Sequence, residues 1–206
     1  MLKIIQGLYL TAAVCFAQYS VSTGGAFPEE AVAYGTLMSK SGIKVSGPEG
    51  VTLEIWWRDS LPSGSTAKED NATLTAVPHG AALGILRVTG KYNDRRGQTI
   101  KPGVYTMRFS LFPPDGNHQG VAPQRDFAIL SPADIDKDAA ARPTFDQLME
   151  MSRKASRTPH PLVLSLWKES APVETGITAE GESDQVLRTM IGGAPVALIV
   201  YGRSDH

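Results

Sequence analysis

Residues 101–130 constrain the fold more than any other stretch, because their apolar side chains recur at every second position. Successive side chains of a β-strand point to opposite faces, so this period predicts a strand with one buried face. The turn that begins the strand is marked by Pro-Gly at 102–103, and the turn that ends it by Pro-Pro-Asp-Gly at 113–116. A polar loop then leads to a return strand, so the stretch predicts an antiparallel hairpin. The expected buried face carries Tyr105, Met107, Phe109 and Leu111.

Other segments repeat the pattern of short strands joined by turns. Residues 51–57 alternate in the same way, and Trp56 lies on the face opposite the predicted core. Residues 185–191 and 196–201 flank two glycines, which supply the positive φ angles of a tight turn, and together they predict a terminal hairpin. The sequence predicts one more short strand at residues 32–38.

One segment has the signals of a helix. Thr144 stands at the N-cap position, and Gln147 follows three residues later, as in a capping box. We therefore expect a mainly β fold, an antiparallel β-sandwich of about eight or nine strands with one short helix near residues 144–156. A closed barrel is the alternative architecture. Residues 169–182 are expected to form a polar loop.

The N-terminus differs in kind from the rest of the chain. Residues 1–17 combine a short positive region, an apolar run and a site of small residues, which is typical of a secretory signal peptide. We expect cleavage near Ala17, export to the periplasm or the extracellular space, and no transmembrane segment in the mature chain. The only cysteine, Cys15, precedes that site, and its lipidation is the alternative. Residues 18–30 are expected to be a flexible leader, and residues 31–206 a single β-sandwich domain.

Composition excludes several classes of partner and chemistry. The formal net charge of the 206 residues is −1, so the chain has no general attraction to nucleic acid. The linear signatures of serine hydrolases, zinc proteases, phosphate loops and dinucleotide sites are all missing from the sequence. A protein or polymer ligand at the cell envelope is the partner that we expect.

Four short motifs resemble those of an uncharacterised group of exported bacterial proteins. They are a PG-x-Y-T-x-R strand at 102–108, a DGNH-x-G loop at 115–120, an RDF return strand at 125–127 and an SRKAS…HP segment at 152–161. The resemblance implies export and a β-rich fold. The first motif is also similar to a strand of transthyretin-like and carboxypeptidase-regulatory β-sandwich modules.

The loop inside the predicted hairpin is the first place to look for a site, because long loops often carry function. We hypothesise that a ligand contacts this loop, its return strand, a proline-flanked histidine and the outward tryptophan. These residues are Asp115, Asn117, His118, Arg125, Asp126, His160 and Trp56. Turn formation is the competing explanation for the Asp-Gly-Asn part of the loop.

A divalent metal is the alternative ligand, and no other cofactor is expected. Histidine nitrogen and carboxylate oxygen suit a transition metal, and a site needs about three or four such ligands. The candidate ligands are His118, Asp115, Asp126 and His160.

Charged residues near the hairpin allow two interpretations. Arg108, Arg125 and Asp126 could surround an anionic ligand, or they could form an exposed cross-strand ion pair worth less than about 1 kcal/mol. The acidic residues at 134–138 begin like a calcium loop but lack its later glycine and glutamate. We interpret them as a solvated acidic loop.

The sequence as a whole favours an exported, non-catalytic β-sandwich that acts as a binding or accessory module in the periplasm or at the cell surface. A metal-binding protein or metal-dependent hydrolase built on His118 and the nearby carboxylates is the alternative. A purely structural envelope protein is the third hypothesis.

Overall fold

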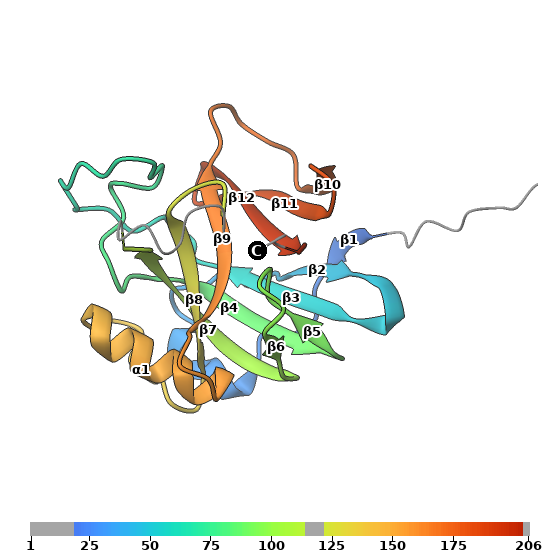
Figure 1. The fold of residues 1–206 in the computed structure, drawn as a ribbon. Coiled ribbons are helices and arrows are strands. Elements are labelled where there is room, and N and C mark those ends of the chain that lie inside the picture. The colour runs from blue at the N-terminus through green and yellow to red at the C-terminus, as the bar shows by residue number, and fades with distance from the viewer. Residues whose placement is uncertain (1–18, 114–121, 204–206) are drawn as a thin grey trace, which may run out of the picture.

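Antiparallel β-strands dominate the computed structural model, which describes residues 19–113 and 122–203 (Figure 1). Ten strands in this part of the chain belong to one sheet, and two short strands form a separate hairpin. The prediction of a mainly β, antiparallel fold is therefore confirmed. The strands of the large sheet are β1 (Ser20–Thr23), β2 (Ile43–Ser46), β3 (Thr52–Trp57), β4 (Ala82–Thr89), β7 (Gly103–Leu111), β8 (Asp126–Pro132), β9 (Leu162–Lys168), β10 (Gly176–Glu180), β11 (Asp184–Ile191) and β12 (Ala194–Tyr201). The small hairpin pairs β5 (Tyr92–Asn93) with β6 (Thr99–Ile100).

The large sheet curls until its two edges nearly meet. Its strand order is β1-β2-β3-β4-β7-β8-β9-β12-β11-β10, and the edge strands β1 and β10 lie against each other without pairing. The rings of Tyr19 and Tyr201 pack across this region with centroids 4.7 Å apart. The sheet is therefore a nearly closed barrel, and not the sandwich of two sheets that the sequence predicts. Alternation of buried and outward residues is the same in both architectures, so the sequence pattern does not separate them.

Strand β9 makes the corner of the barrel (Figure 1). Its first half pairs with β8, where Leu162 lies opposite Leu130, and its second half pairs with β12, where Leu166 lies opposite Leu198. One strand thus belongs to both halves of the sheet, which is how a single sheet encloses a core.

The interior of the barrel holds the main apolar core. Tyr105, Met107 and Phe109 of β7 are all buried there, as the period-two pattern predicts. Strands β7 and β8 pair along their length in the predicted hairpin, with Met107 opposite Leu130. The terminal hairpin of β11 and β12 is also confirmed, and Gly192 and Gly193 have the positive φ angles that its turn requires.

The outer face of the sheet is also covered, which the sequence pattern does not predict. A short 3-10 helix, η1 (Glu29–Tyr34), and residues 133–141 cover the outer side of β3, β4 and β7, where Trp56 and Ile85 are fully buried. A second 3-10 turn, η2 (Pro48–Gly50), links β2 to β3. Residues 32–38, predicted as a strand, contain part of η1 instead.

Helix α1 (Phe145–Ser156) covers another part of the outer face, along β8 (Figure 1). Its first turn closes the predicted capping box, because Thr144 and Gln147 exchange hydrogen bonds. Leu148 and Met149 pack onto Phe127 and Ile129 of β8. The predicted helix near residues 144–156 and its capping box are therefore confirmed.

Three predictions about the ends and loops of the chain meet different outcomes. The predicted leader at residues 18–30 contains β1, which pairs with β2 through Val21 and Val45. The predicted polar loop at residues 169–182 contains β10. The predicted signal peptide at residues 1–17 lies outside the described residues. No helix in the described part of the chain has the length and hydropathy needed to cross a membrane.

Candidate functional site

A cavity of about 230 Å³ lies between α1, the ends of β7 and β8, and the corner at residues 157–161. We call it the helix pocket. Its lining residues are Arg96, Ser110, Leu111, Phe112, Pro113, Phe127, Ile129, Phe145, Met149, Arg153, Pro159, His160, Pro161 and Val163.

The apolar wall of the helix pocket follows from the outer face of the sheet. Phe127 and Ile129 stand two residues apart on β8, so both point to the outer side, and Val163 of β9 lies opposite Ile129. Met149 of α1 closes the wall from the helix side. The rings of Phe112 and Phe127 pack with centroids 5.4 Å apart. An aromatic, water-poor surface of this kind binds the apolar part of a ligand.

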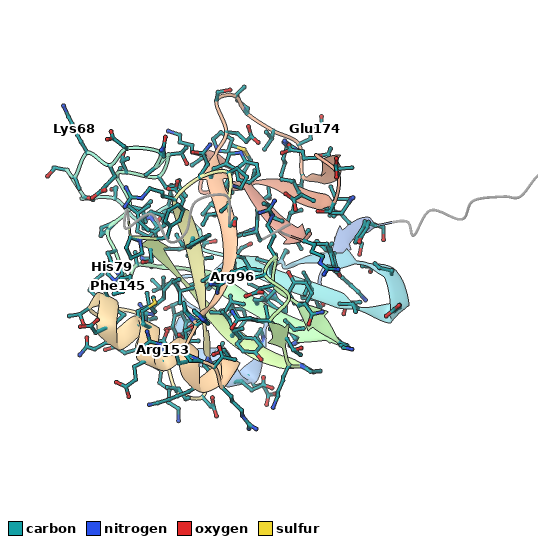
Figure 2. All side chains as sticks on the ribbon, in the orientation of Figure 1. Lys68, His79, Arg96, Phe145, Arg153 and Glu174 are labelled. Atoms are coloured by element: carbon teal, nitrogen blue, oxygen red, sulfur yellow. The ribbon has the colours of Figure 1, made fainter. Side chains whose placement is uncertain are left out.

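Two arginines and a histidine form the polar rim of the pocket. Arg96 donates from Nη2 to the carbonyl of Pro161 at 2.8 Å, while its Nε is buried without a hydrogen-bond partner in the described structure. Arg153 of α1 donates from Nε to the carbonyl of Pro159 at 2.8 Å and is otherwise exposed. Figure 2 shows Arg153 on α1 below Arg96. His160, the third member of the rim, is exposed.

A buried carboxylate holds the rim in place. Asp94 accepts hydrogen bonds from the backbone N–H groups of Arg96 and Gln98, at 3.0 and 2.9 Å, and from the Gln98 side chain at 3.0 Å. Gln98 in turn donates to the Pro161 carbonyl at 3.0 Å and accepts from the Thr158 hydroxyl at 2.7 Å. Burial raises the pKa of Asp94, and these hydrogen bonds oppose the shift. The turn between β5 and β6 therefore fixes the corner that carries His160.

A second cavity of about 340 Å³ lies between β7 and residues 65–79, and we call it the loop pocket. His79 lines it, and the Nδ1 atom of His79 lies 3.2 Å from the hydroxyl of Ser110. Burial lowers the pKa of His79, and a backbone contact with Thr144 opposes the shift. Ser110 is only 1% exposed, and no carboxylate among the described residues hydrogen-bonds to His79. Among the described residues, the pair therefore lacks the third group that orients the base of a nucleophilic serine.

Arg125 and Asp126, both predicted as ligand contacts, instead secure a loop. Asp126 is fully buried and accepts hydrogen bonds from the backbone N–H groups of Thr73 and Leu74, both at 2.8 Å. Arg125 forms an ion pair with Glu69 at 2.9 Å and donates to the carbonyl of Phe112. Burial raises the pKa of Asp126, and the bonds from Leu74 and Thr73 oppose the shift. Arg125 lines the loop pocket, and neither residue lines the helix pocket.

Arg108 has a different partner from the one predicted. It is fully buried and pairs with Asp136 through two hydrogen bonds, from Nε at 2.6 Å and from Nη2 at 2.8 Å. Nη1 donates to the carbonyls of Gly80 and Ala141, and Nη2 also lies within hydrogen-bond distance of the Asp138 carbonyl and the Tyr34 hydroxyl. The predicted cluster with Arg125 and Asp126 is therefore wrong, and so is the interpretation of Asp136 as part of a solvated loop.

Trp56 is not available to a ligand. Its side chain is fully buried on the outer face of β3, where the edge of its ring system meets Phe27 at a centroid distance of 5.8 Å. The guanidinium of Arg87 covers the ring at 5.0 Å, and Gly42 packs against it. The prediction that Trp56 leaves the core face is correct, but the prediction of an exposed contact is wrong, because the N-terminal segment covers that face.

The remaining predicted residues divide into two groups. His160 lines the helix pocket, as a ligand role requires. Asp115, Asn117 and His118 lie outside the described residues. Within the described ranges, no three histidine, cysteine or carboxylate side chains form a group that could hold a metal ion. The metal alternative stays a prediction that depends on His118.

Sequence reasoning missed most of the helix pocket. Its lining comes from the turn after β5, the ends of three strands, α1 and the proline-rich corner, which lie far apart along the chain. The signals that existed were the outward alternate positions of β8 and the basic residues late in α1. No protein-family model, curated protein or solved structure matches this chain.

Proposed function

We propose that the chain is an exported, non-catalytic binding module that holds a small, largely apolar ligand in the helix pocket. The observation that carries this proposal is a concave surface that combines three phenylalanines and a methionine with two arginines, which are anchored at its proline-rich corner. Ligand sites in proteins are typically apolar cavities with a few well-placed polar groups. The barrel and its corner support such a site with rigid strands.

The size of the helix pocket limits the ligand. Its volume of about 230 Å³ lies below the range of roughly 300–1,000 Å³ that is usual for drug-sized ligands. The proposed occupant is therefore a compact molecule of one or two rings or a short acyl chain, or the terminal group of a longer polymer.

A binding role agrees with the use of the buried ionisable groups. Asp94, Asp126 and Asp136 are all committed to hydrogen bonds that hold loops in place. None of the three lines the helix pocket. Asp136 lines a separate cavity beside α1, but its two carboxylate oxygens are bonded to Arg108 and Thr106.

The test is direct binding of a neutral, flat, apolar probe, 2-naphthamide, by titration calorimetry on the mature protein. The Val163→Phe variant fills the pocket from the β9 side, and we expect it to weaken binding at least tenfold. Val104→Phe is the matched control, because Val104 is an outer-face position on β7 that packs under η1 and not into the pocket. Equal binding by wild type and Val163→Phe would refute the helix pocket as the site.

Export is part of the proposal and rests on the sequence of residues 1–17. The helix pocket itself does not depend on export. A binding result and a localisation result therefore test separate parts of the proposal.

A further inference from the structure

We infer that the ligand of the helix pocket is an amphipathic monoanion, whose carboxylate or sulfonate group is bound by Arg96 and Arg153. This inference rests on the proposed binding function and adds the chemical class of the ligand. It is carried by the charge of the pocket lining, by the unused donors of the two arginines and by the apolar wall opposite them.

Among the described residues, the charged groups that line the helix pocket are the two arginines, Arg96 and Arg153, and no described aspartate or glutamate belongs to the lining. The described carboxylate that pairs with Arg96 is Asp94, whose oxygen lies 3.8 Å from Nη2. Asp94 is already occupied by hydrogen bonds from the turn that contains Arg96 and Gln98. The chain therefore places cationic groups here without a full internal counter-charge.

Both arginines retain donors for an additional oxygen atom. The Nε of Arg96 is buried and has no hydrogen-bond partner in the described structure, although Nη2 of the same guanidinium donates to Pro161. A buried donor without an acceptor is unfavourable, so a bound oxygen at this position removes a penalty. Arg153 uses Nε on Pro159 and keeps both Nη groups without a partner among the described residues. Arginine binds carboxylate and related anions through paired donors of this kind.

The position of the two arginines sets how the ligand lies. Their bonds to the Pro159 and Pro161 carbonyls anchor both guanidinium groups at the proline-rich corner. Phe127 and Phe145 line the same cavity. A ligand with an anionic group at the corner and a flat apolar body against the phenylalanines satisfies both ends of the cavity. An apolar molecule without charge leaves the donors unpaired, and a small ion such as phosphate leaves the apolar wall unused.

The experiment compares 2-naphthoate with 2-naphthamide, which share one ring system and differ in the charge of the substituent. Dissociation constants of both probes are measured by titration calorimetry at low and at high ionic strength. We expect the carboxylate to bind at least fivefold more tightly than the amide at low salt, and this preference to decrease as salt screens the arginines.

Variants assign the preference to its residues. Arg96→Gln and Arg153→Gln are each expected to reduce the ratio of naphthoate to naphthamide affinity to less than twofold. The ratio of the two affinities distinguishes a loss of anion recognition from general damage to the pocket, because such damage would weaken the binding of both probes. Lys154→Gln is the matched control, because it removes the same charge from the next residue of α1, which does not line the helix pocket.

The possible outcomes lead to different conclusions. Tight naphthamide binding with no preference for naphthoate overturns the anion inference and leaves the binding function in place. A preference that survives in both arginine variants also overturns it. Failure of both probes to bind the wild-type protein overturns the proposed function and the inference together.

Discussion

Arg108 and Asp136 form an ion pair with two hydrogen bonds inside the protein, and side-chain exposure is 0% for the arginine and 4% for the aspartate. The pair joins β7 to residues 133–141, and the further bonds of Arg108 reach η1 and the turn before β4. Four segments that are distant in the sequence therefore meet at one guanidinium group. The pair contributes to the architecture of the outer layer, and neither partner lines the helix pocket.

Removal of one partner of this pair is expected to be strongly destabilising. Asp136→Asn leaves a buried arginine without its counter-charge, and the cost of such a change is about 3–5 kcal/mol in the free energy of unfolding. Urea titration followed by circular dichroism measures the loss. The exposed neighbour Asp134→Asn is the control and is expected to change stability by less than about 0.5 kcal/mol. A loss of less than about 1 kcal/mol in Asp136→Asn would contradict the buried pair.

The same pair predicts a specific pH dependence of stability. Burial pushes the pKa of Asp136 upward, but the hydrogen bonds from Arg108 and Thr106 and the charge of Arg108 together hold it below its ordinary value of 3.8. The folded state therefore binds this proton less readily than the unfolded state, and the contribution of Asp136 is present above pH 3.8. It is lost as the pH falls below that value through the folded pKa.

The measurement is the stability difference between wild type and Asp136→Asn from about pH 6 to about pH 2.5. We expect the difference to stay constant down to about pH 4 and then to shrink. A difference that grows on acidification would show that the folded pKa is raised instead. Parallel titration of Asp134→Asn removes the part of the change that all carboxylates share.

Gly42 is predicted to be required by the buried Trp56. A methyl group added at Gly42 would lie 2.8 Å from two atoms of the Trp56 ring, closer than carbon atoms in proteins approach. Gly42→Ala should therefore displace the ring or the N-terminal segment and cost about 1–3 kcal/mol. Gly176→Ala is the control, since nothing lies within 4 Å of its added methyl group. Thermal unfolding of the two variants provides the comparison, and equal melting temperatures would contradict the close packing.

Export gives a prediction that depends on the sequence alone. Expression of the full chain in a bacterial host should yield a protein in the periplasm or medium whose first residue is Gln18, the residue after Ala17. N-terminal sequencing determines the cleavage site. Recovery of the chain from the cytoplasm with Met1 in place would overturn the prediction.

The elements that the sequence predicts best are those whose signals are local. The hairpin of β7 and β8 follows from alternation and turns within 30 residues, and the start of α1 follows from Thr144 and Gln147. The closure of the barrel has no local signal, because β1 and β10 approach only after the whole sheet has curled. An alternating pattern of apolar residues indicates that a strand has one buried face. It does not indicate which segments cover the opposite face.

The candidate site illustrates the same limit. His160 was accessible to sequence reasoning because prolines flank it, and it does line the helix pocket. Arg96 carries no signal of its own, since its role arises from the Asp94 turn and the corner that this turn holds. The sequence pattern predicts the correct strand face for Arg108 and Trp56 but wrongly predicts that both are exposed, because the segments that cover them come from other parts of the chain.

The near-meeting of β1 and β10 also bears on how the chain folds. Tyr19 packs on Tyr201, so the last contact that closes the sheet joins the two ends of the described sequence. Contacts of such long separation carry a large loop-closure entropy and slow the search for the native state. The barrel cannot close while its C-terminal strands are still being synthesised. A chain with this topology is therefore expected to complete its fold only after its last strand has been made.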